Sequence, residues 1–309
     1  MFGVAIQAPD ARAAVEQIVQ AERAGVDAVW ATMFGGGGAD MIPIYAAAAM
    51  RTERVLMGTA IVHTWGRQPL TFAQEAAALH ELAPGRFRLG IGSTTAFFVE
   101  RSYGLQYRKP LLNLREYLIT IRALLREGTV EFSGEHVSAR ARIARPAPVP
   151  VMAAALRPKS YALCGELSDG AISWMSPLKY LVETALPTMV EAAAAAGRET
   201  PPLVAHVPIA VTTDRAAARA LARAQLAMYA RVPNYQGMFA AAGYQVDGEY
   251  PDDLLDDLVV SGTEDEVAAG LRRWRDAGMG EILAHPLIEA GDREASLARA
   301  FAAVAAARG

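Results

Sequence analysis

The sequence has few of the residues that build disulfides or metal centres. It contains one cysteine, Cys164, which excludes an intramolecular disulfide and a cysteine-only metal site. The surrounding stretch, SYALCGELSDG, has a helical pattern, so this thiol is interpreted as a small buried hydrophobic side chain. No two-histidine or histidine–carboxylate spacing indicates a metal site either. We therefore expect no bound metal.

Strong charge of one sign and long apolar runs are also absent. The 309 residues have a net charge of −3 and an isoelectric point near 6.0, which gives no basic surface for nucleic acid. No apolar run reaches the roughly 18 residues of a membrane span. The N-terminal stretch, MFGVAIQAPD, has no basic region before an apolar run, unlike a signal peptide. These absences predict a cytoplasmic protein that binds neither nucleic acid nor membrane.

The sequence is rich in apolar segments that alternate with alanine-rich amphipathic segments from one end to the other. Hydrophobic residues make up 52% of the chain, which is enough for a large core. The strand-like segments are expected at 2–6, 25–31, 55–62, 85–92, 149–155, 170–175, 203–212 and 281–287. Helical segments follow them, among them 11–24, 69–82, 111–127, 159–167, 179–196, 263–277 and 292–307.

This alternation predicts one (β/α)8 TIM barrel spanning residues 1–309 as a single domain. Residues 129–140, TVEFSGEHVSAR, alternate with a period of two and predict a hairpin inserted after the fourth helix. A helical insertion is expected between the seventh and eighth strands, where 232–257 interrupt the pattern with proline and glycine. A doubly wound open sheet is the alternative, but no Gly-x-Gly-x-x-Gly fingerprint follows the first strand.

In such a barrel the chemistry lies where strands end, so the residues that follow each strand are the candidates. After the fourth strand, Gly92 allows close approach of a ligand, and Ser93 to Thr95 offer hydroxyls. After the fifth, AAALRPKS places Arg157 and Lys159 at a helix start, which suits a phosphate. The four glycines in FGGGGADM are interpreted as a slack connector with some gating.

His63 is the histidine that stands at a strand end among polar neighbours, in GTAIVHTWGRQP. No carboxylate stands at a matching position to orient its ring, so a hydrolytic triad is not supported. His206 lies within the seventh strand and His285 at the end of the eighth. A lone histidine is more often structural, and these two are interpreted in that way.

Several motifs in order resemble one known group of proteins. They are GTAIVHTWGRQP, GRFRLGIG, FSGE, the stretch VPVMAAALRPKSYALCGELSDGAISWM and the closing GTEDEVAAGLRRWRDAGMGEILA. Together they resemble the bacterial luciferase-like superfamily over nearly the whole chain. They are most similar to its F420-dependent (deazaflavin) oxidoreductases, which include methylenetetrahydromethanopterin-reductase-like enzymes.

The resemblance implies a cofactor, coenzyme F420, with FMN as the alternative used by other branches. It implies a cis peptide bond between Ala60 and Ile61 that backs the central ring. Residues around Gly92, namely Ser93 and Thr94, would approach the cofactor's side chain and phosphate. Backbone amides there would come from the four residues Ala154, Ala155, Leu156 and Arg157. It also implies a homodimer.

The chain departs from this group at the usual acid–base positions. Ala5 stands where methylenetetrahydromethanopterin reductases have a glutamate, and Ser93 to Thr95 replace a common acidic residue. The proton would then come from a hydroxyl such as that of Thr32, from His63, or from water. Apolar side chains are expected to line the substrate pocket: Met33, Phe34, Trp65, Phe97, Phe98, Trp174 and Met175.

The prediction is an oxidoreductase that transfers a hydride between reduced F420 and an unsaturated small molecule such as an enone, an imine or a pterin-like compound. The protein then contributes binding, orientation and electrostatics, because side chains cannot donate hydride. Two alternatives remain open. One is an FMN-dependent monooxygenase supplied by a separate reductase, and the other is a ligand-binding or catalytically silent barrel.

Overall fold

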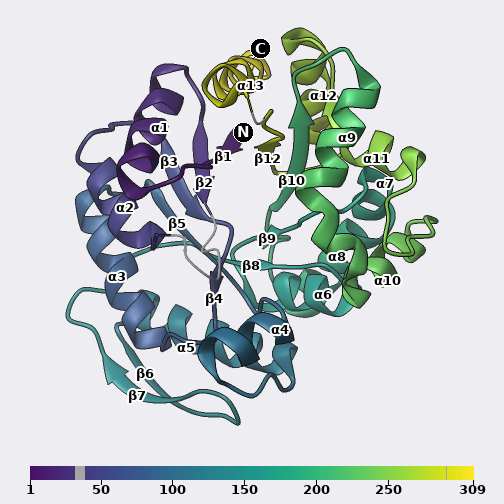
Figure 1. Ribbon diagram of the computed structural model, residues 1–309. Helices are drawn as coiled ribbons and strands as arrows, with labels where there is room; N and C mark the ends of the chain where they lie inside the picture. The colour runs from purple at the N-terminus through teal and green to yellow at the C-terminus, as the bar shows by residue number, and fades with distance from the viewer. Residues whose placement is uncertain (32–38, 290) are drawn as a thin grey trace.

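A computed structural model describes residues 1–31, 39–289 and 291–309, and it contains a closed parallel barrel (Figure 1). The strands pair in the order β12–β1–β2–β3–β5–β8–β9–β10, and β10 also pairs with β12, which closes the ring. This confirms the barrel and excludes the open sheet. The strands are β1 Phe2–Ala5, β2 Ala28–Ala31, β3 Leu56–Thr59, β4 Val62–His63, β5 Phe87–Gly92, β8 Val151–Ala154, β9 Ala171–Ile172, β10 Leu203–Ala210 and β12 Glu281–Pro286.

Helices form the outer layer of the barrel, as Figure 1 shows. Their starts follow the sequence signals: the Asp10 side chain accepts the Ala13 amide at 2.8 Å, and Thr263 and Glu266 form a capping box. None of the described helices has the length and apolar character needed to cross a lipid bilayer. The principal helices are α1 Ala11–Arg23, α2 Met41–Ala49, α3 Pro69–Leu82, α5 Pro110–Glu127, α6 Pro158–Leu167, α8 Leu186–Ala195, α9 Arg215–Leu226, α12 Glu264–Asp276 and α13 Arg293–Ala306.

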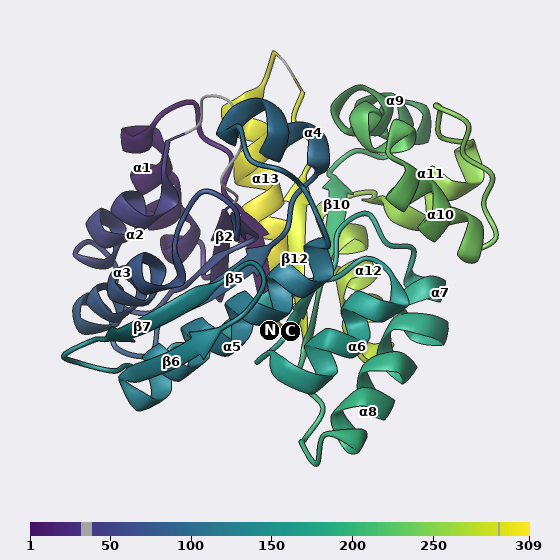
Figure 2. The same ribbon diagram turned by 90° about the horizontal axis from the view of Figure 1, so that it is seen from below.

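The predicted hairpin is present as β6 Thr129–Ser133 and β7 Ser138–Arg142, paired antiparallel. It lies outside the barrel alongside α5 (Figure 2). The buried carboxylate of Glu116 in α5 accepts amide hydrogens from the hairpin turn, at 2.9 Å from Glu135 and 2.7 Å from His136. One carboxylate therefore fixes the turn against the helix.

The helical insertion between β10 and β12 is also present, and it has more regular structure than the sequence pattern predicts. Helices α10 Pro233–Ala241 and α11 Asp252–Leu258 lie within the stretch read as a break, and a short strand, β11 Val260–Ser261, pairs with β10. These short helices bury Phe239 and Leu254, so tertiary packing stabilises them despite the nearby prolines and glycines.

Below the carboxyl ends of the strands, the barrel interior is filled by Trp30 and the apolar side chains around it. Trp30 is fully buried, and its ring needs the space left by Gly58, where an added Cβ would lie 2.4 Å from the indole. The interior cluster consists of Ala5, Ala28, Trp30, Met152, Ile172, Val204 and Leu283, with Leu56, Ala60 and Ile61 packed against it. This cluster fills the barrel below the carboxyl ends of the strands. A ligand therefore reaches the residues above the cluster from the carboxyl end.

Candidate active site at the barrel mouth

The inward positions directly above the closed interior form a ring of residues that we call the mouth layer. Successive side chains on a strand point to opposite faces, so the residue two positions after each interior residue also points inward. Applied to the interior cluster, this alternation places Gln7, Ala154, Trp174, His206 and His285 in the mouth layer. Ala60 and Gly92 complete its described part, because each follows by two positions a glycine that faces the interior, Gly58 or Gly90. Thr32, Met33 and Phe34 lie outside the described residues.

One side of the mouth layer consists of the small residues Ala60, Gly92 and Ala154, and together with the neighbouring Ile61 we call it the small-residue ledge. An added Cβ on Gly92 would lie 2.8 Å from Ile61 Cδ1 and 2.9 Å from the Ala154 methyl group. The Ala60–Ile61 peptide bond is cis, as the resemblance implies. Strand β3 ends just before it and β4 resumes just after it. The result is an apolar patch with little side-chain bulk at the carboxyl ends of β3, β5 and β8.

The opposite side of the mouth layer is polar and contains two histidines in contact, which we call the histidine pair. His206 Nε2 lies 3.3 Å from His285 Nδ1, and His285 Nε2 lies 3.3 Å from the side-chain nitrogen of Gln7. The Trp174 ring packs on both imidazoles, with centroids 4.2 Å from His206 and 4.9 Å from His285. The mouth therefore has an apolar ledge on one side and a covered polar network on the other.

Burial keeps the histidine pair neutral. It lowers the pKa of His285 to about 4, and it lowers the pKa of His206 well below its usual range, with a further contribution from His285. Both imidazoles remain partly exposed at the mouth, so a ligand can reach them. Near neutral pH they offer hydrogen bonds without positive charge.

His63, the predicted catalytic histidine, contacts the segment that follows β5. Its Nδ1 lies 3.2 Å from the Tyr103 hydroxyl, and its ring packs edge-on against Phe98 with centroids 4.8 Å apart. Only 8% of its surface is exposed, and burial lowers the pKa of His63 to about 4. The structure supplies His63 with protein partners and does not place it in the mouth layer.

The lowered pKa values of His63, His206 and His285 predict a loss of stability in mild acid. In the unfolded chain their pKa is about 6.5, whereas His63 and His285 have a pKa of about 4 in the folded protein. Between these values the unfolded state binds more protons, so the free energy of unfolding falls as pH falls. The slope is up to about 1.4 kcal/mol per pH unit for each histidine. Urea unfolding at pH 7.5, 6 and 5 measures it. We expect His63→Phe to reduce the slope, and an unchanged urea midpoint from pH 7.5 to 5 contradicts the assignment.

Two of the three hydroxyls after β5 have partners within the protein. Ser93 Oγ donates to the Pro110 carbonyl at 3.0 Å, and Thr95 Oγ1 accepts the Phe98 amide at the start of a short helix, α4 Ala96–Phe98. At Thr94 the backbone carbonyl accepts from the Tyr107 hydroxyl at 3.0 Å. Ser93 retains accepting capacity for a ligand, but its hydrogen is directed away from one.

The backbone amides after β8, expected to receive a cofactor phosphate, are also engaged. Ser160 Oγ accepts the amides of Leu156 at 3.0 Å and Arg157 at 3.1 Å, while the Ala155 amide pairs with Ile172 in the sheet. The structure therefore differs from the expectation that these amides face a ligand. What remains is the exposed side chain of Arg157, whose guanidinium reaches Gly237 in the insertion.

Of the described aromatic residues expected in the substrate pocket, Trp174 is the one in the mouth layer. Trp65 is only 7% exposed and packs against Tyr107 and against His136 of the hairpin, outside the barrel. Phe97 is 72% exposed on the surface of α4, and Met175 is fully buried. Trp65 therefore has its recorded partners outside the mouth layer, whereas a role for the exposed Phe97 ring at the substrate pocket stays a prediction.

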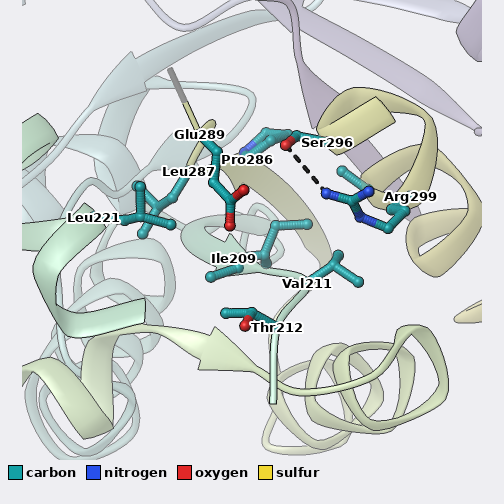
Figure 3. A pocket seen from close by; sticks show the side chains of 11 residues that line it. Ile209, Val211, Thr212, Leu221, Pro286, Leu287, Glu289, Ser296 and Arg299 are labelled. Carbon is teal, nitrogen blue, oxygen red and sulfur yellow. Dashed lines mark hydrogen bonds between the residues drawn. The ribbon is translucent and has the colours of Figure 1, made fainter. Parts of the chain in front are cut away.

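A small pocket between the insertion and α13 is separate from the mouth layer (Figure 3). It encloses about 10 Å³, room for roughly one water molecule, between Ile209, Pro286 and Arg299. Ile209 and Pro286 are each one position away from an inward residue, so they face outward from the barrel. This pocket is too small to hold the substrate, and it lies on the outer face of β10 and β12.

Comparison with known proteins identifies the family of this barrel. The luciferase-like monooxygenase family model matches residues 2–281. The chain belongs to the luciferase-like monooxygenase family. A putative coenzyme F420-dependent oxidoreductase of Mycobacterium tuberculosis is 30% identical to it over 310 residues, covering 85% of this chain and 88% of that protein. An F420-dependent glucose-6-phosphate dehydrogenase of Beutenbergia cavernae is 35% identical over 218 residues, covering 66% of this chain and 65% of that protein.

A solved structure of the same fold spans the whole chain. The F420-dependent secondary alcohol dehydrogenase, in complex with an F420–acetone adduct, matches with a TM-score of 0.83 at 20% identity, covering 100% of this chain and 99% of that one. At this identity the match supports the fold, and it agrees with the closed barrel described above. The predicted family is thus confirmed by sequence and by fold.

The described polar groups of the mouth layer come from three residues. Ala5 is buried in the apolar interior, so no carboxylate enters the mouth from β1. The polar side chains are those of Gln7, His206 and His285. Taken singly, neither His206 nor His285 has a sequence signal that marks it as part of a site. The signal lies in strand alternation, because His206 follows the inward Val204 and His285 the inward Leu283 by two positions on paired strands.

Proposed function

We propose that the protein is an F420-dependent oxidoreductase that transfers a hydride between the deazaflavin cofactor and an unsaturated small molecule. The observation that carries this proposal is the small-residue ledge, where Ala60, Gly92 and Ala154 leave little side-chain bulk above the closed interior and a Cβ added to Gly92 would collide with Ile61 and Ala154. The names of the relatives support F420 as the ring that occupies it. We also propose that the protein acts as a homodimer in the cytoplasm, which rests on the resemblance.

The residues of the mouth fit a deazaflavin. When bound, F420 supplies a carbon-bound hydride that no side chain can provide. Ala60, Gly92 and Ala154 would lie under its tricyclic ring, and Trp174 would exclude water from the opposite side. Arg157 stands at the β8 exit, where its guanidinium can pair with the phosphate of the cofactor tail. The substrate would lie between the ring and the histidine pair.

Titration with F420 and FMN tests the choice of cofactor. We expect oxidised F420 to bind with micromolar affinity or better, detected by quenching of its fluorescence, and FMN to bind more weakly. If FMN alone binds in this range, the protein belongs with the monooxygenases that use a separate flavin reductase. Binding of F420 without turnover across enones and imines would instead indicate a silent barrel.

A second test asks whether Arg157 holds the cofactor tail. It uses substitutions of Arg157 itself and of Gly237, which its guanidinium contacts. An added Cβ at Gly237 would lie 2.0 Å from Arg157 Nη1, so Gly237→Ala displaces the guanidinium without removing its charge. We expect Arg157→Ala to raise the Kd for F420 about tenfold, which is the loss of one charge-assisted hydrogen bond, and Gly237→Ala to raise it less.

The matched controls are a ligand and a variant. The deazariboflavin core, which lacks the phosphate-bearing tail, should bind all variants equally. Arg145→Ala removes an exposed arginine near the hairpin and should change neither Kd. If Arg157→Ala raises the Kd for the tailless core as much as the Kd for F420, this side chain supports the ring site and does not bind the phosphate.

A further inference from the structure

The hydrogen bonds around the histidine pair determine which nitrogen carries each proton. The Gln7 side-chain nitrogen lies 2.7 Å from the Pro286 carbonyl, which can only accept, so this atom is the amide NH2. Its second hydrogen is directed to His285 Nε2 at 3.3 Å, and that nitrogen must therefore accept. Neutral His285 then carries its proton on Nδ1 and donates it to His206 Nε2. The proton of neutral His206 is left on Nδ1.

This arrangement opposes protonation of either ring. An additional proton would sit on His285 Nε2 against the Gln7 amide hydrogen, or on His206 Nε2 against the His285 N–H. The described contacts of the two rings are Gln7, Trp174 and each other, and none of these is a carboxylate that would stabilise an imidazolium. Burial lowers the pKa of both histidines in the same direction.

We propose that the histidine pair selects an uncharged substrate whose reducible bond is conjugated to a carbonyl or imine, with the His206 Nδ1–H donating a hydrogen bond to that oxygen or nitrogen. His285 and Gln7 are positioning residues that hold His206 in the donating tautomer. This inference rests on the proposed function, because it assigns a role to the polar side of the same site.

The chemistry balances with one hydride and one proton. Reduced F420, when bound, would supply the hydride with both electrons to the electrophilic carbon of the substrate. The π electrons move to the carbonyl oxygen or imine nitrogen, where the His206 N–H stabilises the developing negative charge. The imidazole keeps its hydrogen, because an imidazolate is too basic to leave behind. Water supplies the proton to the product, and the oxidised cofactor releases one in turn.

The described positions of the mouth layer include no lysine or arginine, and both histidines are neutral. The Arg293 guanidinium approaches from outside the layer, where it is exposed and already donates to the Gln7 carbonyl. A phosphate or carboxylate placed beside the two histidines would lose its hydration without gaining an ion pair, which is strongly unfavourable. Trp174 adds an apolar wall on the same side. We therefore expect cyclic enones and imines to be substrates, and sugar phosphates not to be.

The first test is independent of the cofactor and of turnover. Nitrogen-15 NMR of histidine side chains in the cofactor-free wild-type protein at pH 7 distinguishes the charged form and the two neutral tautomers. Single-histidine variants assign the signals. We expect His206 and His285 both to be neutral with the proton on Nδ1. A charged ring, or a proton on Nε2 of either one, overturns the proposal.

The second test uses isosteric amides at His206. Asparagine places its NH2 near the position of Nδ1, whereas glutamine places it near Nε2. His206→Asn should keep kcat for a cyclic enone within about tenfold of wild type, and His206→Gln should lower it about 100-fold, the usual effect of losing one such donor. At His285, asparagine should likewise retain more activity than glutamine. The Kd for F420 should be unchanged in all four variants.

The outcomes separate this proposal from the proposed function. Equal losses in His206→Asn and His206→Gln overturn the role of the histidine pair while F420 dependence stands. Efficient oxidation of a sugar phosphate by the wild type with oxidised F420 would do the same. Failure of the wild type to bind F420 overturns the proposed function, and the NMR result still decides the tautomers.

Discussion

Replacing Ala60 by leucine is expected to abolish F420 binding while the barrel stays folded. Ala60 packs against the upper surface of the interior cluster and is partly exposed at the mouth. A leucine there extends over the small-residue ledge, into the space that the planar ring requires. Fluorescence titration with F420 measures the loss, and circular dichroism with urea unfolding shows that the fold is retained.

A matched substitution separates this steric effect from the general effect of a larger side chain. Ala195 is exposed in the last turn of α8, so Ala195→Leu should leave the Kd for F420 unchanged. Normal F420 binding by Ala60→Leu would mean that the ring does not lie on the ledge.

Removal of Glu281 is expected to lower the free energy of unfolding by about 3–5 kcal/mol, the usual cost of leaving a buried charge without its partner. The Glu281 carboxylate, 5% exposed, accepts from Trp30 Nε1 at 2.8 Å and pairs with Arg88 at the closed end of the barrel. The Arg88 guanidinium also lies over the Trp30 ring at 4.3 Å. Glu281→Ala therefore leaves one buried cation and one indole N–H unpaired. Urea unfolding at pH 7.5 measures the change.

Two variants calibrate that result. Glu281→Gln keeps an acceptor for Trp30 and should cost less than alanine. Asp276→Ala breaks the exposed pair with Arg275 and should cost no more than about 1 kcal/mol. If Glu281→Ala is as mild as Asp276→Ala, the ion pair adds nothing to the closed end of the barrel.

Much of the architecture follows from the sequence because it depends on local patterns. Strand-like and helical segments alternate strictly, and the period-two stretch at 129–140 forms the hairpin. The pattern misses α10 and α11, since proline and glycine interrupt their periodicity and their stability comes from burying residues such as Phe239. It also misses β11, a two-residue strand that exists only because β10 offers an edge.

The site was less predictable, because its geometry depends on contacts between distant segments. The resemblance anticipates the cis bond at Ala60–Ile61, but no local pattern shows that Ser160 occupies the amides after β8. The position of Trp65 after a strand predicts that it lines the site. In the structure it packs on His136 of the hairpin, a contact between distant segments that no local pattern shows. His206 and His285 are 79 positions apart, and the register of β10 on β12 brings them together.

Hydride transfer from labelled cofactor tests the central claim most directly. The protein is mixed anaerobically with F420 reduced and deuterated at its hydride-bearing carbon, together with a cyclic enone, and the product is examined by mass spectrometry. We predict one deuterium in each product molecule and one oxidised F420 formed with it, without oxygen. A product that lacks deuterium, or turnover that requires FMN and oxygen, would contradict the account.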